Sequence, residues 1–522
     1  MPFERASGVL AHPTSFPGLH GIGDLGDSAF RFIDWLHTAE QRYWQIMPLV
    51  PVGPGNSPYA SVSAFAGNPL LISLSRLVND GFLDASDLSD APTFPSNRVD
   101  YEAAADYKES KLRRAFDRHR SGAASQLRPE METFLAEEAS WVHDYALFMA
   151  LKHHFSDAWW LEWDAEIAFR APGATEEWAN QLRAEVDYHN FVQFLFSRQW
   201  GKLKQHANER GVGIIGDIPI FVAHDSADVW SNQAQFRLDA SGRPNVVAGV
   251  PPDYFSRTGQ LWGNPHYDWK AMAADGYRWW IERFRSLLRH VDVIRIDHFR
   301  GFAAAWVVPA DAKTAASGRW ERGPGSELFH AIHSALGDVP IIVEDLGLIT
   351  EDVETLRHDL NMPGMAVLQF AFGDGPDNAY LPHNYRDPIV VYPGTHDNQT
   401  TIGWFAGLDD ATRAQVQTYL GQDGSDIAWD FIRLAMASTA ELALISIQDV
   451  LRLGDEARMN TPGTGLGNWT WRFDPRQLDA GIASGLATLT ETYGRVPPVE
   501  KGARKRDPYD YTAEGTKHSL YA

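Results

Sequence analysis

Eight short apolar runs, each ending in a polar or glycine-rich stretch, constrain the fold of this chain more than any other feature. Runs that are apolar on both faces are typical of parallel strands buried between helices. Helical patterns lie between most of them, such as "DSAFRFIDWLHTAE" after the first run and "SELFHAIHSAL" before the sixth. Strands alternating with helices predict a (β/α)8 TIM barrel. The runs lie at 7–12, 43–49, 211–219, 291–299, 303–309, 339–347, 365–372 and 388–398.

The length of the chain predicts large insertions in this barrel. A (β/α)8 barrel typically needs about 250 residues, and the chain has 522. We expect one catalytic barrel over 1–500, with a mainly helical insertion at about 75–190 and a loop-rich insertion at about 222–275. The amphipathic pattern of 429–451 predicts further helix after the last strand. The polar segment 501–522 is expected to be a C-terminal tail.

Composition excludes several classes of protein. The net charge of -22 argues against binding to a nucleic-acid backbone. The absence of cysteine excludes disulfides, thiolate catalysis and Cys-ligated metals. The N-terminus lacks a signal-peptide pattern, and no apolar run is long enough to span a membrane, so we expect a cytoplasmic protein without a membrane partner. The sequence indicates no oligomeric state.

Acidic side chains follow several of the predicted strands. The third run ends at Asp217, the fourth at Asp297, the sixth at Glu344, and the eighth in "GTHDN" with His396 and Asp397. In barrel enzymes the chemistry takes place at the C-terminal ends of the strands. One such acid is explained by a helix N-cap, and for Asp217 a strand-end cap remains an alternative. Several acids at one rim repel one another, and that cost is typical of a functional site.

Two carboxylates that face one sugar ring are suited to glycoside chemistry. Arg295 and Asp297 point to the same face of their strand, so we expect the cation to keep Asp297 ionised, as a nucleophile requires. A buried ion pair that closes the strand is the structural alternative. Glu344 has no evident cation beside it, and we expect its pKa to be raised, as a general acid requires. Asp397, with His396, is expected to bind sugar hydroxyls and stabilise positive charge.

Longer motifs make the resemblance specific. "RIDHFRG", "VEDLG", "GTHDN" and "GDIPIFV" resemble the retaining α-amylase-type clan. "NSPYASVSAFAGNPLLISL" (56–74), "GVPPDYFSRTGQLWGNPHYDW" (249–269) and "RMNTPGTGLGNWTWR" (458–472) are similar to the amylomaltase family of 4-α-glucanotransferases, or disproportionating enzymes. The resemblance covers about 7–74, 190–301, 339–400 and 456–472.

The resemblance implies a barrel without a separate C-terminal β-domain. It implies transfer of an α-1,4-glucan segment from a donor to the 4-hydroxyl of an acceptor glucan or glucose, with maltooligosaccharides as substrates and neither metal nor cofactor. Asp297 would be the nucleophile of a retaining double displacement, Glu344 the acid/base and Asp397 the transition-state stabiliser. The residues expected to bind the donor sugar are Asp217, Arg295, His298 and His396. Weaker candidates for subsite contacts are Tyr59, Asp374 and Asn468. His298 has the alternative of pointing away from the cleft.

The segment 249–269 bears on the choice between transferase and hydrolase. A transferase must keep water from the covalent intermediate and hold an acceptor. Tyr254, Phe255 and Trp262 are large rings in a segment with Gly249, Gly259 and Gly263 as hinges. Trp262 is equally well explained as a packing anchor. The alternatives to a transferase are a retaining α-glucan hydrolase and a non-catalytic glucan-binding barrel, and the latter would be expected to lack one of the three principal carboxylates.

Overall fold

Eight parallel strands rich in β-branched residues form the central sheet of the protein. The computed structural model describes residues 3–252 and 256–496. Val343 N donates to Pro363 O (3.1 Å) and links β9 to the chain entering β10, so the two ends of the sheet meet and the (β/α)8 barrel is confirmed. In sheet order the strands are β10 (Gly364–Val367), β11 (Ile389–Tyr392), β12 (Leu442–Ser446), β1 (Ala6–Leu10), β2 (Tyr43–Gln45), β3 (Gly213–Ile218), β6 (Val293–Ile296) and β9 (Ile341–Val343).

One of the eight predicted barrel strands is wrong, and one barrel strand was not predicted. The run at 303–309 forms β7 (Ala304–Pro309), which pairs antiparallel with its neighbours outside the barrel. Parallel strands need a crossover of about a dozen residues, and only a short helix, α12 (Arg300–Ala303), separates β6 from β7. The missing barrel strand is β12, in the segment 429–451 that the sequence predicts as helix. Glu344 therefore follows the fifth barrel strand, and Asp397 the seventh.

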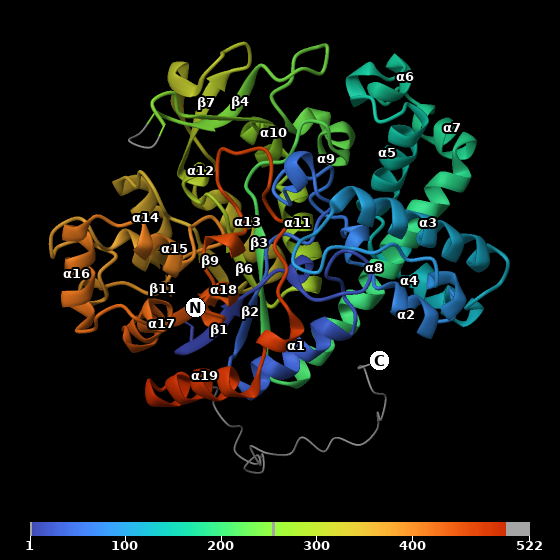
Figure 1. The fold of residues 1–522 in the computed structure, drawn as a ribbon. Helices are drawn as coiled ribbons and strands as arrows, with labels where there is room; N and C mark the ends of the chain where they lie inside the picture. Colours follow the sequence, from blue (N-terminus) through green and yellow to red (C-terminus); the bar gives the residue numbers. More distant parts are fainter. Residues whose placement is uncertain (1–2, 253–255, 497–522) are drawn as a thin grey trace.

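Helices surround the barrel and cover the outer faces of its strands (Figure 1). The helix α8 is the longest in the described residues, and its N-terminal part extends away from the barrel toward the helical insertion. The helices that lie between or after the barrel strands are α1 (Asp27–Thr38), α8 (Arg183–Glu209), α11 (Arg278–His290), α13 (Ser326–Leu336), α14 (Glu351–Asp359), α15 (Thr401–Ala406), α16 (Asp410–Leu420), α17 (Ile427–Ala437), α18 (Ile447–Val450) and α19 (Ala480–Thr492).

Two excursions from the barrel flank its C-terminal rim. Between β2 and α8 lie the helices α2 (Leu74–Asn79), α3 (Tyr101–Arg120), α4 (Arg128–Glu137), α5 (Val142–His154), α6 (Ala165–Ala168) and α7 (Ala174–Gln181). A four-stranded antiparallel sheet, in the order β5-β4-β7-β8, lies at the top of Figure 1 and has the strands β5 (Gln260–Pro265), β4 (Val246–Val250), β7 and β8 (Arg319–Arg322). Two of its strands form within 222–275, where the sequence predicts loop, beside α9 (Ala227–Ser231) and α10 (Trp269–Ala274).

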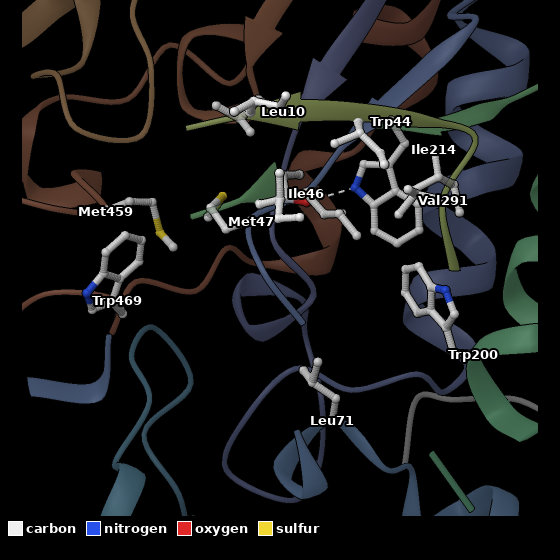
Figure 2. Packing of buried hydrophobic residues seen from close by; sticks show 14 of the residues in the cluster. Leu10, Trp44, Ile46, Met47, Leu71, Trp200, Ile214, Val291, Met459 and Trp469 are labelled. Carbon is white, nitrogen blue, oxygen red and sulfur yellow. Dashed lines mark hydrogen bonds between the residues drawn. The ribbon is translucent and has the colours of Figure 1, made fainter. Parts of the chain in front are cut away.

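The core has an inner and an outer part. One buried cluster is drawn from barrel strands alone, including Ile215, Val293 and Val390, and fills the barrel interior. The larger cluster packs the outer faces of the strands against the helices. In Figure 2, Trp44 of β2 lies among Ile46, Ile214, Val291 and Trp200 of α8. Its indole N–H donates to Ala11 O (2.7 Å), so the buried polar group is satisfied.

The two ends of the described chain meet at the bottom of the barrel. The Arg495 side chain is fully buried, and its guanidinium donates to the carbonyls of Ala6, Met436 and Glu441, among others. No separate β-domain follows β12 in the part of the chain that is described, and the predicted tail 501–522 lies outside it. None of the helices within 3–252 and 256–496 has the length and apolar character of a membrane span.

Candidate active site

Adjacent strands bring one arginine and two carboxylates together at the rim. Asp217 of β3 and Arg295 of β6 are register partners in the parallel ladder. Arg295 Nη1 donates to Asp217 Oδ2 (2.6 Å) and to Asp297 Oδ1 (3.2 Å). The Asp217 side chain is 1% exposed, whereas that of Asp297 is 30% exposed. Asp297 therefore faces the open side of the site, while Asp217 anchors the arginine from within.

Backbone N–H groups hold the Glu344 carboxylate. It accepts from His298 N (2.7 Å) through Oε2 and from Leu346 N (3.0 Å) through Oε1. His298 has a φ of 52°, in the left-handed region that non-glycine residues rarely occupy. Such strained backbone is concentrated at functional sites. The turn after β6 thus presents the Asp297 side chain and, one residue later, a backbone donor to Glu344.

The Asp397 carboxylate is positioned by a segment far along the chain. Asn460 Nδ2 donates to Asp397 Oδ1 (2.6 Å), and Asn460 N donates to His396 O (3.1 Å). Arg458 Nη2 donates to the backbone carbonyl of Asp397 (2.9 Å). The Asp397 side chain remains 46% exposed. The sequence analysis did not single out Asn460 or Arg458, although both lie in the motif "RMNTPGTGLGNWTWR".

A hydrogen-bonded chain joins the two sides of the rim through Tyr59. The Tyr59 hydroxyl donates to Asp217 Oδ2 (2.8 Å) and lies 3.0 Å from His396 Nε2. Because the hydroxyl has one proton, His396 must carry its proton on Nε2 and donate to the Tyr59 oxygen. The indole of Trp469 packs against both rings, with centroid distances of 5.8 Å. Tyr59 is thus part of the network that holds Arg295.

Burial dominates the acid–base properties of the two principal carboxylates. Arg295 lowers the pKa of Asp297, as expected, but burial together with Asp217, Glu344 and Asp397 raises it more, so the net shift is upward. The expectation that the arginine would set the net direction is therefore wrong. The pKa of Glu344 is raised, in the predicted direction, because of burial; Arg295 and the two N–H donors oppose the rise.

The ring of Trp262 lies against the turn that bears Asp297. Its centroid is 4.8 Å from that of His298 in an edge-on arrangement, and the residue is 38% exposed. The His298 ring therefore faces Trp262 of β5, and its contact with the donor sugar stays a prediction. Burial, with the charge of Arg300 adding to it, lowers the pKa of His298 to about 4, so the imidazole is neutral near pH 7. Tyr254 and Phe255 lie outside the described residues.

Two candidates from the sequence are not brought into this cluster. The exposed Asp374 accepts from Asn378 Nδ2 (3.4 Å) on a loop after β10. The amide of Asn468 bonds its own loop, accepting from Thr461 N (2.9 Å) and donating to Thr464 O (2.9 Å). The contacts of Asn468 shape the loop that carries Trp469. Across the described ranges, no group of His, Asp and Glu is arranged to hold a metal ion.

The fold and the three carboxylates together define a class of enzyme. A barrel with Asp297, Glu344 and Asp397 at the ends of separate strands is typical of enzymes that cleave or transfer glycosidic bonds through an oxocarbenium-like state. The family model described as 4-alpha-glucanotransferase matches residues 11–478.

Curated relatives and solved structures agree with this match. The chain is 51% identical to a 4-alpha-glucanotransferase of Synechocystis sp. over 94% of this chain and 98% of the relative, and 47% identical to one of Thermus thermophilus over 95% and 100%. The structure of an amylomaltase from Streptococcus agalactiae in complex with acarbose matches with a TM-score of 0.92 at 38% identity, covering 95% of this chain and 100% of that one. The chain belongs to the 4-alpha-glucanotransferase family.

Proposed function

We propose that the protein transfers α-1,4-glucan segments from a donor maltooligosaccharide to the 4-hydroxyl of an acceptor glucan or glucose. The observation that carries the proposal is the rim cluster: Asp297 contacts Arg295, and Glu344 and Asp397, which follow other strands, lie near enough to raise the pKa of Asp297. The family supplies the transferase reaction and the roles of the three carboxylates, and the proximity of these groups supports those roles.

In the first step Asp297 attacks the anomeric carbon of the donor. The bond from that carbon to the glycosidic oxygen breaks, and Glu344 gives its proton to the departing oxygen. Arg295, at 3.2 Å, favours the ionised form of Asp297 against the burial that opposes it. Asp397 accepts hydrogen bonds from sugar hydroxyls through the oxygen that Asn460 does not use, and its charge stabilises the oxocarbenium-like state.

In the second step an acceptor hydroxyl replaces the enzyme carboxylate. Glu344, now ionised, takes the proton of the acceptor 4-hydroxyl while its oxygen bonds the anomeric carbon, and Asp297 leaves as a carboxylate. Two inversions give net retention at the anomeric carbon. Water in place of the acceptor would give hydrolysis, so the exclusion of water decides between the two reactions.

Incubation with maltotriose tests the proposal. We expect a ladder of longer maltooligosaccharides together with glucose, and no such products from the Asp297→Asn variant. Glucose and maltose without longer chains would identify a hydrolase and would contradict the proposal. The cytoplasmic location expected from the sequence stays a prediction.

A further inference from the structure

A second pocket lies between the helical insertion and the barrel helices. It has a volume of about 460 Å³, within the range of about 300–1,000 Å³ that small-molecule sites occupy. Helices α5, α9 and α11 contribute to its walls, and no residue of the carboxylate cluster lines it. A narrower cavity beside Tyr59 has only about 60 Å³, room for about two water molecules. Of these two cavities, only the larger has room for a sugar.

Aromatic rings form one part of the pocket wall. Trp141, Tyr145, Trp279 and Phe65 line it. The Phe65 ring is stacked on Trp141 with a centroid distance of 6.1 Å and meets Trp279 edge-on at 5.8 Å. The rings are held by mutual packing, so the surface is formed before any ligand binds. Such rigid amphipathic rings are suited to the C–H face of a pyranose.

Acceptor groups dominate the rest of the lining. The lining includes the buried Asp228, the carboxylates of Asp275 and Glu282, and the amide of Gln235. Arg278 is the one basic residue among the lining residues described. The lining carboxylates of Asp144 and Glu282 form ion pairs with Arg170 and Arg285. This leaves Asp228 and Asp275 against Arg278, so the pocket offers no net positive charge to a phosphate or other anion. Carboxylate and amide oxygens accept hydrogen bonds from hydroxyl groups. The lining therefore favours a neutral, hydroxyl-rich ligand over an anion.

Two buried polar atoms, on residues that line this wall, have no hydrogen-bond partner among the described residues. They are the indole N–H of Trp279, a residue that is 7% exposed, and the amide oxygen Oε1 of Gln235. A buried donor or acceptor without a partner costs about 1–3 kcal/mol. One needs an acceptor and the other a donor. A hydroxyl group is both, whereas an ammonium group cannot accept from the indole.

We propose that this pocket is a carbohydrate-binding site separate from the active site, and that it holds a segment of a neutral α-glucan. The choice of α-glucan among neutral carbohydrates rests on the proposed function; the binding of carbohydrate does not. The pocket is linked to the active site through the backbone, because Asp228 Oδ2 accepts from Ala64 N (2.7 Å) in the segment that also carries Tyr59. A long glucan held here would stay near the rim between transfers.

Native electrophoresis through gels that contain glycogen tests the site. The full chain is used with Asp297→Asn, so that the glycogen is not consumed. Adding Asn232→Trp, which fills the pocket from the segment after α9, should weaken glycogen binding by about tenfold. Asn180→Trp, the same change at an exposed position of α7, should leave binding unchanged. Equal retardation of the Asn232→Trp and parent proteins would overturn the proposal.

Activity and a second polysaccharide separate the possible failures. With Asp297 intact, Asn232→Trp should keep maltotriose turnover within about twofold, because neither the nucleophile nor its partners change. If Asn232→Trp fails to fold, Gln235→Ala takes its place. Its retardation by glycogen and its maltotriose turnover are then measured in the same way. Pocket-dependent binding without transfer on maltotriose would refute the proposed function alone. Pocket-dependent retardation by a soluble β-1,4-linked polysaccharide but not by glycogen would overturn the choice of α-glucan, and pocket-dependent retardation by neither would overturn the site.

Discussion

At the scale of single residues, Arg295 is the side chain on which the rim depends most. It is 3% exposed and contacts two carboxylates with one guanidinium nitrogen, while Tyr59 donates to one of the same carboxylates. Lysine at this position would keep the charge but lose the planar fork. We expect Arg295→Lys to lower kcat/KM on maltotriose by about 100-fold, or about 2.7 kcal/mol, with a melting temperature close to that of the unchanged protein.

The control for Arg295→Lys is Arg319→Lys, the same substitution at an exposed position of β8. Turnover of Arg295→Lys within about threefold of the control would mean that its contact with Asp297 is incidental to catalysis.

Asn460 is a positioning residue that only the structure identifies. Its amide donates to Asp397 at 2.6 Å, and a hydrogen bond to a charged group contributes about 1.5–3 kcal/mol. Asn460→Ala should therefore lower kcat on maltotriose about 10- to 100-fold, with a smaller change in KM, because the freed carboxylate loses its orientation in the transition state. The matched variant Asn378→Ala lies on another loop and should keep kcat. Equal kcat values for the two variants would contradict the positioning role.

At the scale of elements, β5 places the ring of Trp262 against the turn that bears Asp297. Trp262 meets His298 edge-on, whereas the neighbouring Leu261 points to the opposite face of the strand. If the indole keeps water from the covalent intermediate, Trp262→Ala should shift products from transfer toward hydrolysis. The ratio of reducing ends created to glucose transferred on maltotriose measures this shift. Leu261→Ala is the control. The same ratio in both variants would show that the Trp262 ring does not keep water from the intermediate.

The junction of β12 with α15 contains a buried acid that couples stability to pH. Asp449 accepts from Thr401 N and Oγ1 and from Ser446 Oγ, and burial raises its pKa to about 6. A raised acid pKa means that the folded state binds the proton more tightly, so this contribution to stability is lost as pH rises from 3.8 to about 6. The difference between those values corresponds to about 3 kcal/mol.

Asp449→Asn removes this titration. The free energy of unfolding of the native protein, relative to that of the variant, should therefore fall by about 2.4 kcal/mol between pH 4 and pH 7. Urea titrations at several pH values measure it, with Asp410→Asn, an exposed helix residue, as the baseline. A pH-independent difference between the native protein and Asp449→Asn would show that folding does not shift the pKa of Asp449.

Local patterns explain which elements could be predicted from the sequence. Apolar runs with acids at their ends are local, and they indicated the barrel, Asp297, Glu344 and Asp397. The partner of a strand is not a local property, so the apolar runs of β7 and β12 did not show which of them belongs to the barrel. Asn460 and Asp397 are 63 positions apart in the sequence, and no periodic pattern predicts a contact between residues so far apart.

At the scale of the whole molecule, Arg495 ties the C-terminal end of the described chain to the barrel. The residue is 0% exposed, and its guanidinium donates to six backbone carbonyls, among them those of Ala6 and Glu441. Arg495→Ala would leave several buried carbonyls without donors, so we expect a loss of at least about 3 kcal/mol in the free energy of unfolding. Urea denaturation measures the loss. Arg476→Ala, at an exposed position, should cost little; an equal cost would contradict this role.

The pairing of β1 with β12 has a consequence for how the protein folds while the ribosome synthesises it. Ala6 is among the first described residues, and its register partner Leu442 is among the last of the barrel. Until Ser446 has left the exit tunnel, one edge of β1 has no neighbour and exposes unpaired backbone groups. The barrel therefore closes only after Ser446 has been synthesised, and until then this edge of β1 is open to pairing with other chains.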